Sequence, residues 1–171
     1  MAAWCAGEGR AFDLLVARFG PEVHGFLRRQ LGDSQQAEDA WSETWIRVVR
    51  NRDRYQGSGQ FRAWLFSIAR RCAMDSSRGR RRWLNLARRV FSHRDAAAAP
   101  SPELRVLGDE RDEAVLAAVL ELPAEHRAVV LLTYQQGLDS AEVGRALDLT
   151  PQQVRSRLTY ARQRLRASLE P

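Results

Sequence analysis

The stretch of sequence that decides the fold runs from Leu138 to Leu169 and reads LDSAEVGRALDLTPQQVRSRLTYARQRLRASL. Thr150 supplies a capping hydroxyl, Pro151 suits the first helical position, and Gln153 stands three residues after the cap. This combination predicts a helix that begins with a capping box. Beyond it, apolar side chains recur at the spacing of one buried helical face: Val154, Leu158, Ala161 and Leu165.

A shorter helix is predicted just upstream, from Ser140 to Leu147, with Val143, Ala146 and Leu147 turned inward. Asp148-Leu149 is then a tight connection between two helices. A short helix, a brief turn and a second helix with polar residues at its start is how a helix-turn-helix presents side chains to a major groove. An arginine-rich hairpin that binds no DNA would look similar, but the capping and the turn length together favour DNA binding.

Charge is distributed unevenly along the 171 residues, whose net charge is +6. Residues 70–102 carry 9 Arg against 2 acidic residues, residues 103–149 carry 4 against 10, and residues 150–171 carry 5 against 1. Every basic residue is Arg. Two basic blocks separated by an acidic one suggest two separate contacts with a polyanion.

Several function classes are disfavoured by the sequence. Cys5 and Cys72 with three isolated histidines do not have zinc-site spacing, so we expect no metal and no cofactor. No secretory signal pattern and no run of about 20 apolar residues is seen, which predicts a cytoplasmic protein with no membrane contact. The motifs of metalloproteases, serine hydrolases and P-loop enzymes are missing, so we expect no enzyme.

The N-terminal part predicts a long amphipathic helix followed by a second helix. Gly20-Pro21 would kink the first helix or split it in two. Asp33 or Ser34 would cap the second, which should run to about Arg50. The second helix should bury these residues: Ala37, Trp41, Trp45 and Val48 or Val49. Its opposite face carries a stripe of Asp39, Ser42, Glu43 and Ile46, which on periodicity alone is a solvated face.

A third helix should begin at Phe61, after the glycine-rich loop 55–60, and end in the arginine-rich run 76–83. Its apolar stripe consists of Trp64, Leu65, Ile68, Ala69, Cys72 and Ala73. The aromatic residues and arginines around this helix would suit unstacked bases and phosphates. They would equally suit a core and a solvated tail, and the residues alone leave both interpretations open.

The remaining chain completes an all-α fold. Residues 84–108 lack core periodicity and contain Pro100-Ser101-Pro102, which is typical of a linker. Helices are then predicted over Glu110–Leu122 and Pro123–Gln136, the latter with Ala128, Val129, Leu132 and Tyr134 as candidate core residues. We therefore expect two small helical domains, 1–83 and 109–171, joined by a flexible linker, 84–108; the second domain contains the helix-turn-helix.

In four stretches the chain resembles a bacterial RNA polymerase sigma factor of the extracytoplasmic-function (ECF, group 4) branch of the sigma-70 family. The resemblance covers about residues 7–82 and 110–168. The stretches are Ala11-Phe12 with its helix; Ala37-Glu38-Asp39 with Glu43-Thr44-Trp45; Phe61-Arg62-Ala63-Trp64-Leu65-Phe66-Ser67-Ile68-Ala69-Arg70; and Val154-Arg155-Ser156-Arg157-Leu158 with Ala161-Arg162. The third stretch is the most specific of these.

The resemblance implies three binding surfaces. Core polymerase would bind Glu38, Asp39, Ser42, Glu43 and Arg47. The −10 element, with a flipped base, would contact Tyr55, Gln56, Ser58, Gln60, Phe61, Arg62, Trp64, Phe66, Arg70, Arg71 and Arg78. The −35 element would be read by Gln152, Gln153, Arg155, Ser156, Arg157 and Tyr160. Ser42, Arg71, Gln152-Gln153 and Tyr160 depart from the residues usual in the family.

The implied function is promoter-specific initiation of transcription, with −35 and −10 recognition and promoter opening. The implied partners are promoter DNA and core RNA polymerase, through its β and β′ subunits. An anti-sigma factor is a frequent partner in the family, and the free protein would be a monomer. The alternative is a helix-turn-helix transcriptional regulator that acts without being a polymerase subunit; promoter-specific binding by the isolated chain would favour it.

Overall fold

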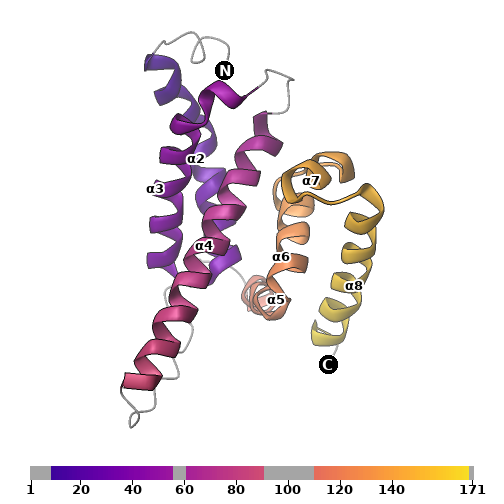
Figure 1. The fold of residues 1–171 in the computed structure, drawn as a ribbon. Helices are drawn as coiled ribbons and strands as arrows, with labels where there is room; N and C mark the ends of the chain where they lie inside the picture. Colours follow the sequence, from indigo (N-terminus) through magenta and orange to yellow (C-terminus); the bar gives the residue numbers. More distant parts are fainter. Residues whose placement is uncertain (1–8, 56–60, 91–109, 170–171) are drawn as a thin grey trace.

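The computed structural model describes residues 9–55, 61–90 and 110–169, and these residues form helices and no strand. The elements are α2 (Gly9–Leu31), α3 (Ser34–Arg50), the 3-10 turn η1 (Arg52–Arg54), α4 (Phe61–Val90), α5 (Glu110–Glu121), α6 (Ala124–Val130), the π-helical turn η3 (Leu131–Gln135), α7 (Ser140–Leu147) and α8 (Pro151–Leu169). This confirms the predicted all-α class. Figure 1 shows α2, α3 and α4 grouped side by side, with α5 to α8 beside them.

Helix α2 is continuous through Pro21, so the predicted split does not occur. Gly20 lies close to Trp41 of α3, whose indole Nε1 donates a hydrogen bond to the Gly20 carbonyl oxygen at 3.1 Å. Trp41 is for this reason only half-buried, at the edge of the core and not inside it as predicted. Trp45 is buried, and its ring meets that of Phe12 edge to face at 5.9 Å.

Helix α3 begins where the capping pattern predicts. Of the two candidates, Asp33 is the cap: its carboxylate accepts a hydrogen bond from the Gln36 backbone N–H at 2.9 Å. At the other end, Val48 is fully buried and Val49 is exposed. Val48, and not Val49, therefore lies on the core face of α3.

Helix α4 is longer than predicted and continues to Val90. The predicted end of this helix at residue 83 is wrong because residues 84–90 contain neither Gly nor Pro, and nothing in them stops a helix. Its last turns extend beyond the rest of the molecule in Figure 1, and Trp83 and Leu86 are exposed there. The rest of the predicted linker, 91–108, lies outside the described residues.

The second unit follows the predicted helices with two differences. Pro123 precedes α6 instead of beginning it, and the helix widens into the π-helical turn at Leu131. Ala128, Val129 and Leu132 are buried as predicted, but Tyr134 is 58% exposed. Tyr134 points outward because its hydroxyl accepts a hydrogen bond from Arg162 Nε of α8 at 2.8 Å.

The helix-turn-helix has the predicted bounds and the predicted capping box. The Thr150 N–H donates to Gln153 Oε1 at 2.8 Å, and the Gln153 N–H donates to Thr150 Oγ1 at 3.2 Å. Helix α7 has a second capping box, made by Asp139 and Glu142. The chain leaves α7 through Asp148 in the left-handed region, at φ 58°.

Gly144 allows this turn because it has no side chain. We can therefore predict how an added side chain would change the free energy of unfolding. A Cβ atom placed there would lie 2.5 Å from the backbone oxygen of Leu149. We expect Gly144→Ala to reduce the free energy of unfolding by about 1–3 kcal/mol, because the backbone of the turn must shift. Gly79→Ala is the control: nothing lies within 4 Å of its Cβ position, and alanine should stabilise α4 by about 0.5–1 kcal/mol. Urea denaturation measures both, and equal effects would contradict the steric explanation.

The two units also pack directly against each other. The buried apolar side chains of α2, α3 and α4 form one continuous core with those of α5 to α8. Helix α7 lies along α4, and α2 contacts α5, α6 and the π-helical turn (Figure 1). Polar bonds cross the same boundary: Gln30 Nε2 donates to the Ala124 carbonyl oxygen at 3.0 Å, and Arg127 Nη1 donates to the Gln30 carbonyl oxygen at 2.6 Å.

Candidate nucleic-acid and polymerase interfaces

The acidic stripe on α3 is an exposed surface, and two acidic residues along it, Glu38 and Glu43, have partners within the chain. Glu38, Asp39 and Ser42 are exposed, and Ile46 between them and the helix end is 45% exposed. Glu43 differs, since its Oε1 accepts from Arg47 Nε at 2.7 Å. Asp39 has no basic partner among the described residues; its Oδ1 accepts only a long hydrogen bond of 3.4 Å from Gln35. The stripe therefore presents carboxylates to solvent.

Arg47 joins this stripe to α4. Its guanidinium also donates to Asp75 Oδ2 at 2.8 Å, and the hydrogen bonds that it donates to Glu43 and Asp75 raise the pKa of Arg47. Beside the stripe, an open hollow of about 350 Å³ lies between α2 and α3. It is lined by Val16, Ala17, Gly20, Pro21, His24, Glu38 and Trp41, and His24 Nε2 lies 2.6 Å from Glu38 Oε1. This face combines an apolar hollow with negative charge.

The aromatic residues near the start of α4 divide between core and surface. Phe66 is fully buried against Phe26, with ring centroids 5.4 Å apart, so it lies in the core and does not present a surface to DNA in this structure. Phe61 is 7% exposed and is covered by Tyr55 and Trp64, at 5.9 and 5.8 Å between centroids. In this arrangement Phe61 cannot receive a base without being uncovered.

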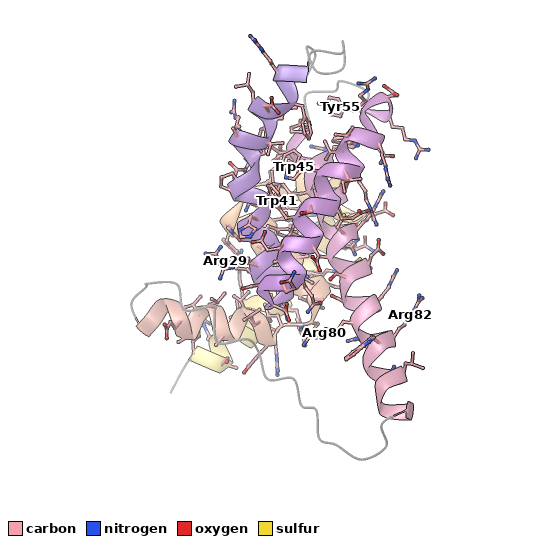
Figure 2. All side chains as sticks on the ribbon, turned by 90° about the vertical axis from the view of Figure 1, so that its left-hand side faces the viewer. Arg29, Trp41, Trp45, Tyr55, Arg80 and Arg82 are labelled. Atoms are coloured by element: carbon pink, nitrogen blue, oxygen red, sulfur yellow. The ribbon has the colours of Figure 1, made fainter. Side chains whose placement is uncertain are left out.

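Tyr55 and Trp64 form the outer layer of this aromatic cluster. Both are half-buried, and their ring centroids are 5.3 Å apart. Figure 2 shows Tyr55 at the end of the molecule opposite to Arg80 and Arg82. Gln56, Ser58 and Gln60 lie outside the described residues. Within this aromatic cluster, these two rings are the ones that a base could reach.

The arginines assigned to the −10 surface differ in their partners. Arg71 and Arg78 are exposed, with no hydrogen bond or ion pair among the described residues. Arg62 instead donates through Nη2 to Glu22 Oε2 at 3.1 Å and to the Gln136 carbonyl oxygen at 2.8 Å. Arg70 donates to both carboxylate oxygens of Glu125, at 2.9 and 3.2 Å. Arg62 and Arg70 are therefore engaged with the second unit.

The start of α8 presents the predicted polar set. Gln152, Gln153, Arg155 and Ser156 are exposed, although Gln153 Oε1 is already used in the capping box. Arg157 is half-buried and donates through Nη1 to Glu125 Oε2 at 3.0 Å. The four exposed residues, Gln152, Gln153, Arg155 and Ser156, are therefore the ones that can reach a base edge.

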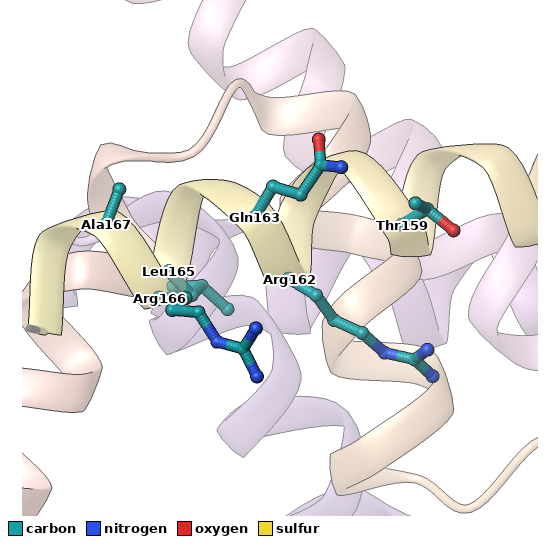
Figure 3. Close-up of a pocket in the computed structure, with 6 residues that line it drawn as sticks. All are labelled: Thr159, Arg162, Gln163, Leu165, Arg166 and Ala167. Carbon is teal, nitrogen blue, oxygen red and sulfur yellow. The ribbon is translucent and has the colours of Figure 1, made fainter.

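Tyr160 is 42% exposed, and its ring packs on His126, with ring centroids 4.4 Å apart. Burial, together with the neighbouring charge of Arg157, lowers the pKa of His126. Further along α8, an open hollow is lined by Thr159, Arg162, Gln163, Leu165, Arg166 and Ala167 (Figure 3). The arginines in Figure 3 point to one side of the helix, and Arg162 also stacks on the Tyr134 ring at 5.9 Å.

Two residues with a clear structural role were missed by sequence reasoning. Glu125 pairs with Arg70 and Arg157, and Arg127 bonds to carbonyl oxygens of α2 and of the α5 end. Arg70 lies 55 positions from Glu125, and Gln30 lies 97 positions from Arg127. No local sequence pattern could therefore reveal these interactions. Within residues 9–55, 61–90 and 110–169 we find no cluster of metal-ligating side chains and no helix with the length and hydropathy needed to cross a membrane.

Comparison with known proteins agrees with this geometry. The family model described as Sigma-70 region 2 matches residues 15–83, and that described as Sigma-70, region 4 matches residues 112–165. RNA polymerase sigma factor CarQ of Myxococcus xanthus is 33% identical over 166 residues, which covers 95% of this chain and 91% of CarQ. ECF RNA polymerase sigma factor SigL of Mycobacterium tuberculosis is 32% identical over 168 residues, which covers 96% of this chain and 92% of SigL.

Solved structures have the same fold. CnrH, solved in complex with the cytosolic domain of CnrY, superposes with a TM-score of 0.72 at 25% identity, over 98% of this chain and 93% of CnrH. The sigma factor RpoE of Bartonella quintana, solved with the anti-sigma factor NepR, superposes with a TM-score of 0.76 at 21% identity, over 94% of this chain and 97% of RpoE. With both family models matched and relatives similar over nine-tenths of their length, this chain belongs to the sigma-70 family of RNA polymerase sigma factors, in its ECF branch.

Proposed function

We propose that this protein binds core RNA polymerase and directs it to promoters by recognising a −35 and a −10 element and helping to open the DNA. The observation that supports this most strongly is the coincidence of the two sigma-70 matches with the two helical units, each of which presents an exposed polar surface. We further propose that the two predicted domains, 1–83 and 109–171, act as the two functional units. The protein would be a cytoplasmic initiation factor, without catalytic activity of its own and monomeric when free.

Core polymerase would dock on the exposed face of α3. Asp39 and Ser42 are accessible there, and Glu43 is held in place by Arg47. Carboxylates exposed beside apolar side chains such as Ile46 favour a partner surface that is basic and partly apolar. We propose the β′ subunit as this partner, with β as the other subunit of core polymerase that the protein contacts.

The −35 element would be read by the start of α8. Hydrogen-bonding side chains at the beginning of a recognition helix can reach base edges in the major groove, and arginines beside them contact phosphates. Gln152, Arg155 and Ser156 have the exposure that this role requires. Gln153 keeps its side-chain N–H group free, since only its oxygen is used in the capping box.

The −10 element would be held at the start and along the exposed side of α4. Extruding a base costs roughly a few kcal/mol, which stacking on aromatic rings and cationic support must offset. Tyr55 and Trp64 provide accessible rings, and Arg71 and Arg78 provide unpaired charge within the described residues. Phe61, with the loop that precedes it, would join the site once uncovered.

The rival interpretation, a helix-turn-helix regulator independent of polymerase, accounts for less of the chain. A regulator needs only the region 4-like unit, whereas similarity to sigma factors extends through both units and over 91% or more of CarQ and SigL. The neighbours CnrH and RpoE were solved with CnrY and NepR, so we also propose that a protein partner of the anti-sigma class binds this chain.

Binding to core polymerase tests this proposal. We expect Asp39→Ala combined with Glu43→Ala to weaken the complex about tenfold or more, which corresponds to about 1.4 kcal/mol, since the variant can no longer pair these carboxylates with basic groups of the partner. Because Glu43→Ala also releases Arg47, Asp75→Ala is the matched control: it removes the other partner of Arg47 and leaves the stripe intact. A pull-down with purified core enzyme compares the binding of the wild-type protein, the double variant and Asp75→Ala. Unchanged binding of the double variant, or an equal loss with Asp75→Ala, would remove the stripe from this role.

A further inference from the structure

Helix α6 holds the middle of helix α8 at two neighbouring positions. The ring of His126 packs on the ring of Tyr160, with ring centroids 4.4 Å apart and an angle of 44° between the ring planes. One residue earlier on α6, Glu125 Oε2 accepts a hydrogen bond from Arg157 Nη1 at 3.0 Å. Helices α6 and α8 lie against each other (Figure 1), so both contacts are internal to the region 4-like unit.

Tyr160 lies in line with the proposed base-reading residue Gln153. One row along α8, at spacings of four, three and four residues, consists of Gln153, Arg157, Tyr160 and Arg164. Since a helix rises about 1.5 Å per residue, Tyr160 stands roughly 10 Å further along α8 than Gln153. The major groove is about 12 Å wide, so a helix whose first turn touches base edges brings a side chain at this distance to the phosphates at the edge of the groove.

The Tyr160 side chain has one covered face and one free end. Its ring packs on His126 but is still 42% exposed, and no hydrogen bond of its hydroxyl group is found within the described residues. A phenol O–H group can donate a hydrogen bond to a phosphate oxygen. An exposed aromatic side chain otherwise moves between rotamers, and ordering it on binding reduces affinity. Because the contact with His126 already orders the ring, less of this cost remains when DNA binds.

His126 is itself fixed and uncharged. It stands in the first turn of α6, where its backbone N–H donates to the Pro123 carbonyl oxygen at 2.9 Å. Burial and the charge of Arg157 lower the pKa of His126, although the neighbouring Glu125 acts to raise it, so the imidazole is neutral at neutral pH. Its Nδ1 atom is buried and has no hydrogen-bond partner among the described residues. The imidazole therefore acts on Tyr160 through the surface of its ring, and not through a charge or a hydrogen bond.

We propose that His126 is a positioning residue for −35 recognition: its ring orders Tyr160 so that the phenol hydroxyl donates to a backbone phosphate at the edge of the major groove. This rests on the proposed function, because it takes α8 as the helix that reads the −35 element. A phosphate contact carries no sequence information, but it fixes the register of the helix in the groove. His126, on α6, thereby acts on DNA through Tyr160.

His126→Ala and His126→Phe test the positioning. Alanine removes the ring, whereas phenylalanine keeps a flat ring and does not need the hydrogen-bond partner that Nδ1 lacks. With the full-length protein and a fluorescent duplex that carries the −35 element, we expect His126→Ala to reduce affinity about fivefold and His126→Phe to stay within about twofold of wild type. The same fold decrease is expected on a scrambled duplex, because phosphates are present in every sequence. Equal affinities of the two variants would overturn the proposal.

Tyr160→Phe tests whether His126 acts through the hydroxyl group of Tyr160. It keeps the ring and removes the hydroxyl, so we expect affinity to fall about fivefold, and His126→Ala to cause less than about a twofold further decrease in this background. Tyr134→Phe is the matched control: it removes a phenol hydroxyl that Arg162 uses, and Arg162 follows Tyr160 by two residues and so lies on nearly the opposite side of α8. It should leave affinity within about twofold of wild type. Independent, multiplying losses in the double variant, or an equal decrease with Tyr134→Phe, would contradict the role of Tyr160.

Circular dichroism shows whether each variant is folded at the assay temperature. If His126→Ala does not fold, Tyr160→Phe still decides, since wild-type affinity of this conservative variant would overturn the proposal. Two further results separate the proposals. If the wild-type protein prefers the −35 duplex to the scrambled one while His126→Ala and Tyr160→Phe bind like wild type, the positioning role fails alone. If the wild-type protein supports no transcription with core polymerase, the proposed function fails.

Discussion

Gln153→Ala combined with Arg155→Ala is expected to reduce specific binding to a −35 duplex by about 1–3 kcal/mol for each base that is no longer hydrogen-bonded. Both residues stand exposed in the first turns of α8, on the part of a recognition helix that enters the major groove. The decrease should appear on the cognate sequence and be small on a scrambled duplex, because neighbouring arginines still bind the phosphates. Fluorescence anisotropy at fixed salt measures the difference between the two duplexes.

The double variant also breaks the capping box, since Gln153 Oε1 accepts from the Thr150 N–H. Thr150→Ala is therefore the control: it removes the reciprocal bond from the Gln153 N–H to Thr150 Oγ1 and leaves both base-reading side chains. We expect it to lower stability by about 0.5–2 kcal/mol while specificity is largely kept. An equal decrease on cognate and scrambled DNA would show that Gln153 and Arg155 only contact phosphate.

Arg127→Met should have the largest effect on stability among single changes, with a decrease of about 3 kcal/mol in the free energy of unfolding. The Arg127 guanidinium donates to the carbonyl oxygens of Val119 at 3.2 Å, Leu122 at 3.0 Å and Leu120, all at the end of α5. It also donates to the Gln30 carbonyl oxygen of α2 at 2.6 Å. The carbonyl groups at a helix end have no partner within the helix, so methionine would leave several of them unsatisfied in a shielded place.

Burial lowers the pKa of Arg127 from its ordinary value, and the hydrogen bonds to these carbonyl oxygens hold the guanidinium in place. Arg145→Met is the matched control, because Arg145 is exposed on α7 and no partner for it is found in the part of the chain that the structure describes. Its effect should stay within about 0.5 kcal/mol. Urea denaturation followed by circular dichroism compares Arg127→Met with Arg145→Met. Similar decreases in the free energy of unfolding would contradict the proposed role of Arg127, which is to connect the ends of α2 and α5 by hydrogen bonds.

Local features of this fold were predictable from sequence. A capping side chain accepts a hydrogen bond from the backbone N–H three residues later, so Asp33 and Thr150 mark helix starts that the structure contains. The buried face of α8 follows in the same way from the spacing of Val154, Leu158 and Ala161. These interactions depend on neighbours in sequence and need no knowledge of the rest of the chain.

Features that depend on distant residues were not predictable. Phe66 and Trp64 are both aromatic residues of α4, and Phe66 is the buried one because it packs into the core beside Phe26 of α2. The charge of Arg70 suggests a DNA contact, but its engagement by Glu125 depends on how the two units pack. The core pattern of α4 ends before the helix does, because an exposed helical segment needs no core pattern to continue to Val90.

Reconstituted transcription tests the central claim most directly. Purified core RNA polymerase is combined with this protein on fragments of genomic DNA, and the 5′ ends of the transcripts are mapped. We expect discrete start sites that require both the protein and the core enzyme, with a shared pair of sequence elements upstream of them. The absence of RNA on every template, or the same start sites with core enzyme alone, would contradict the assignment of this chain as a promoter-directing sigma factor.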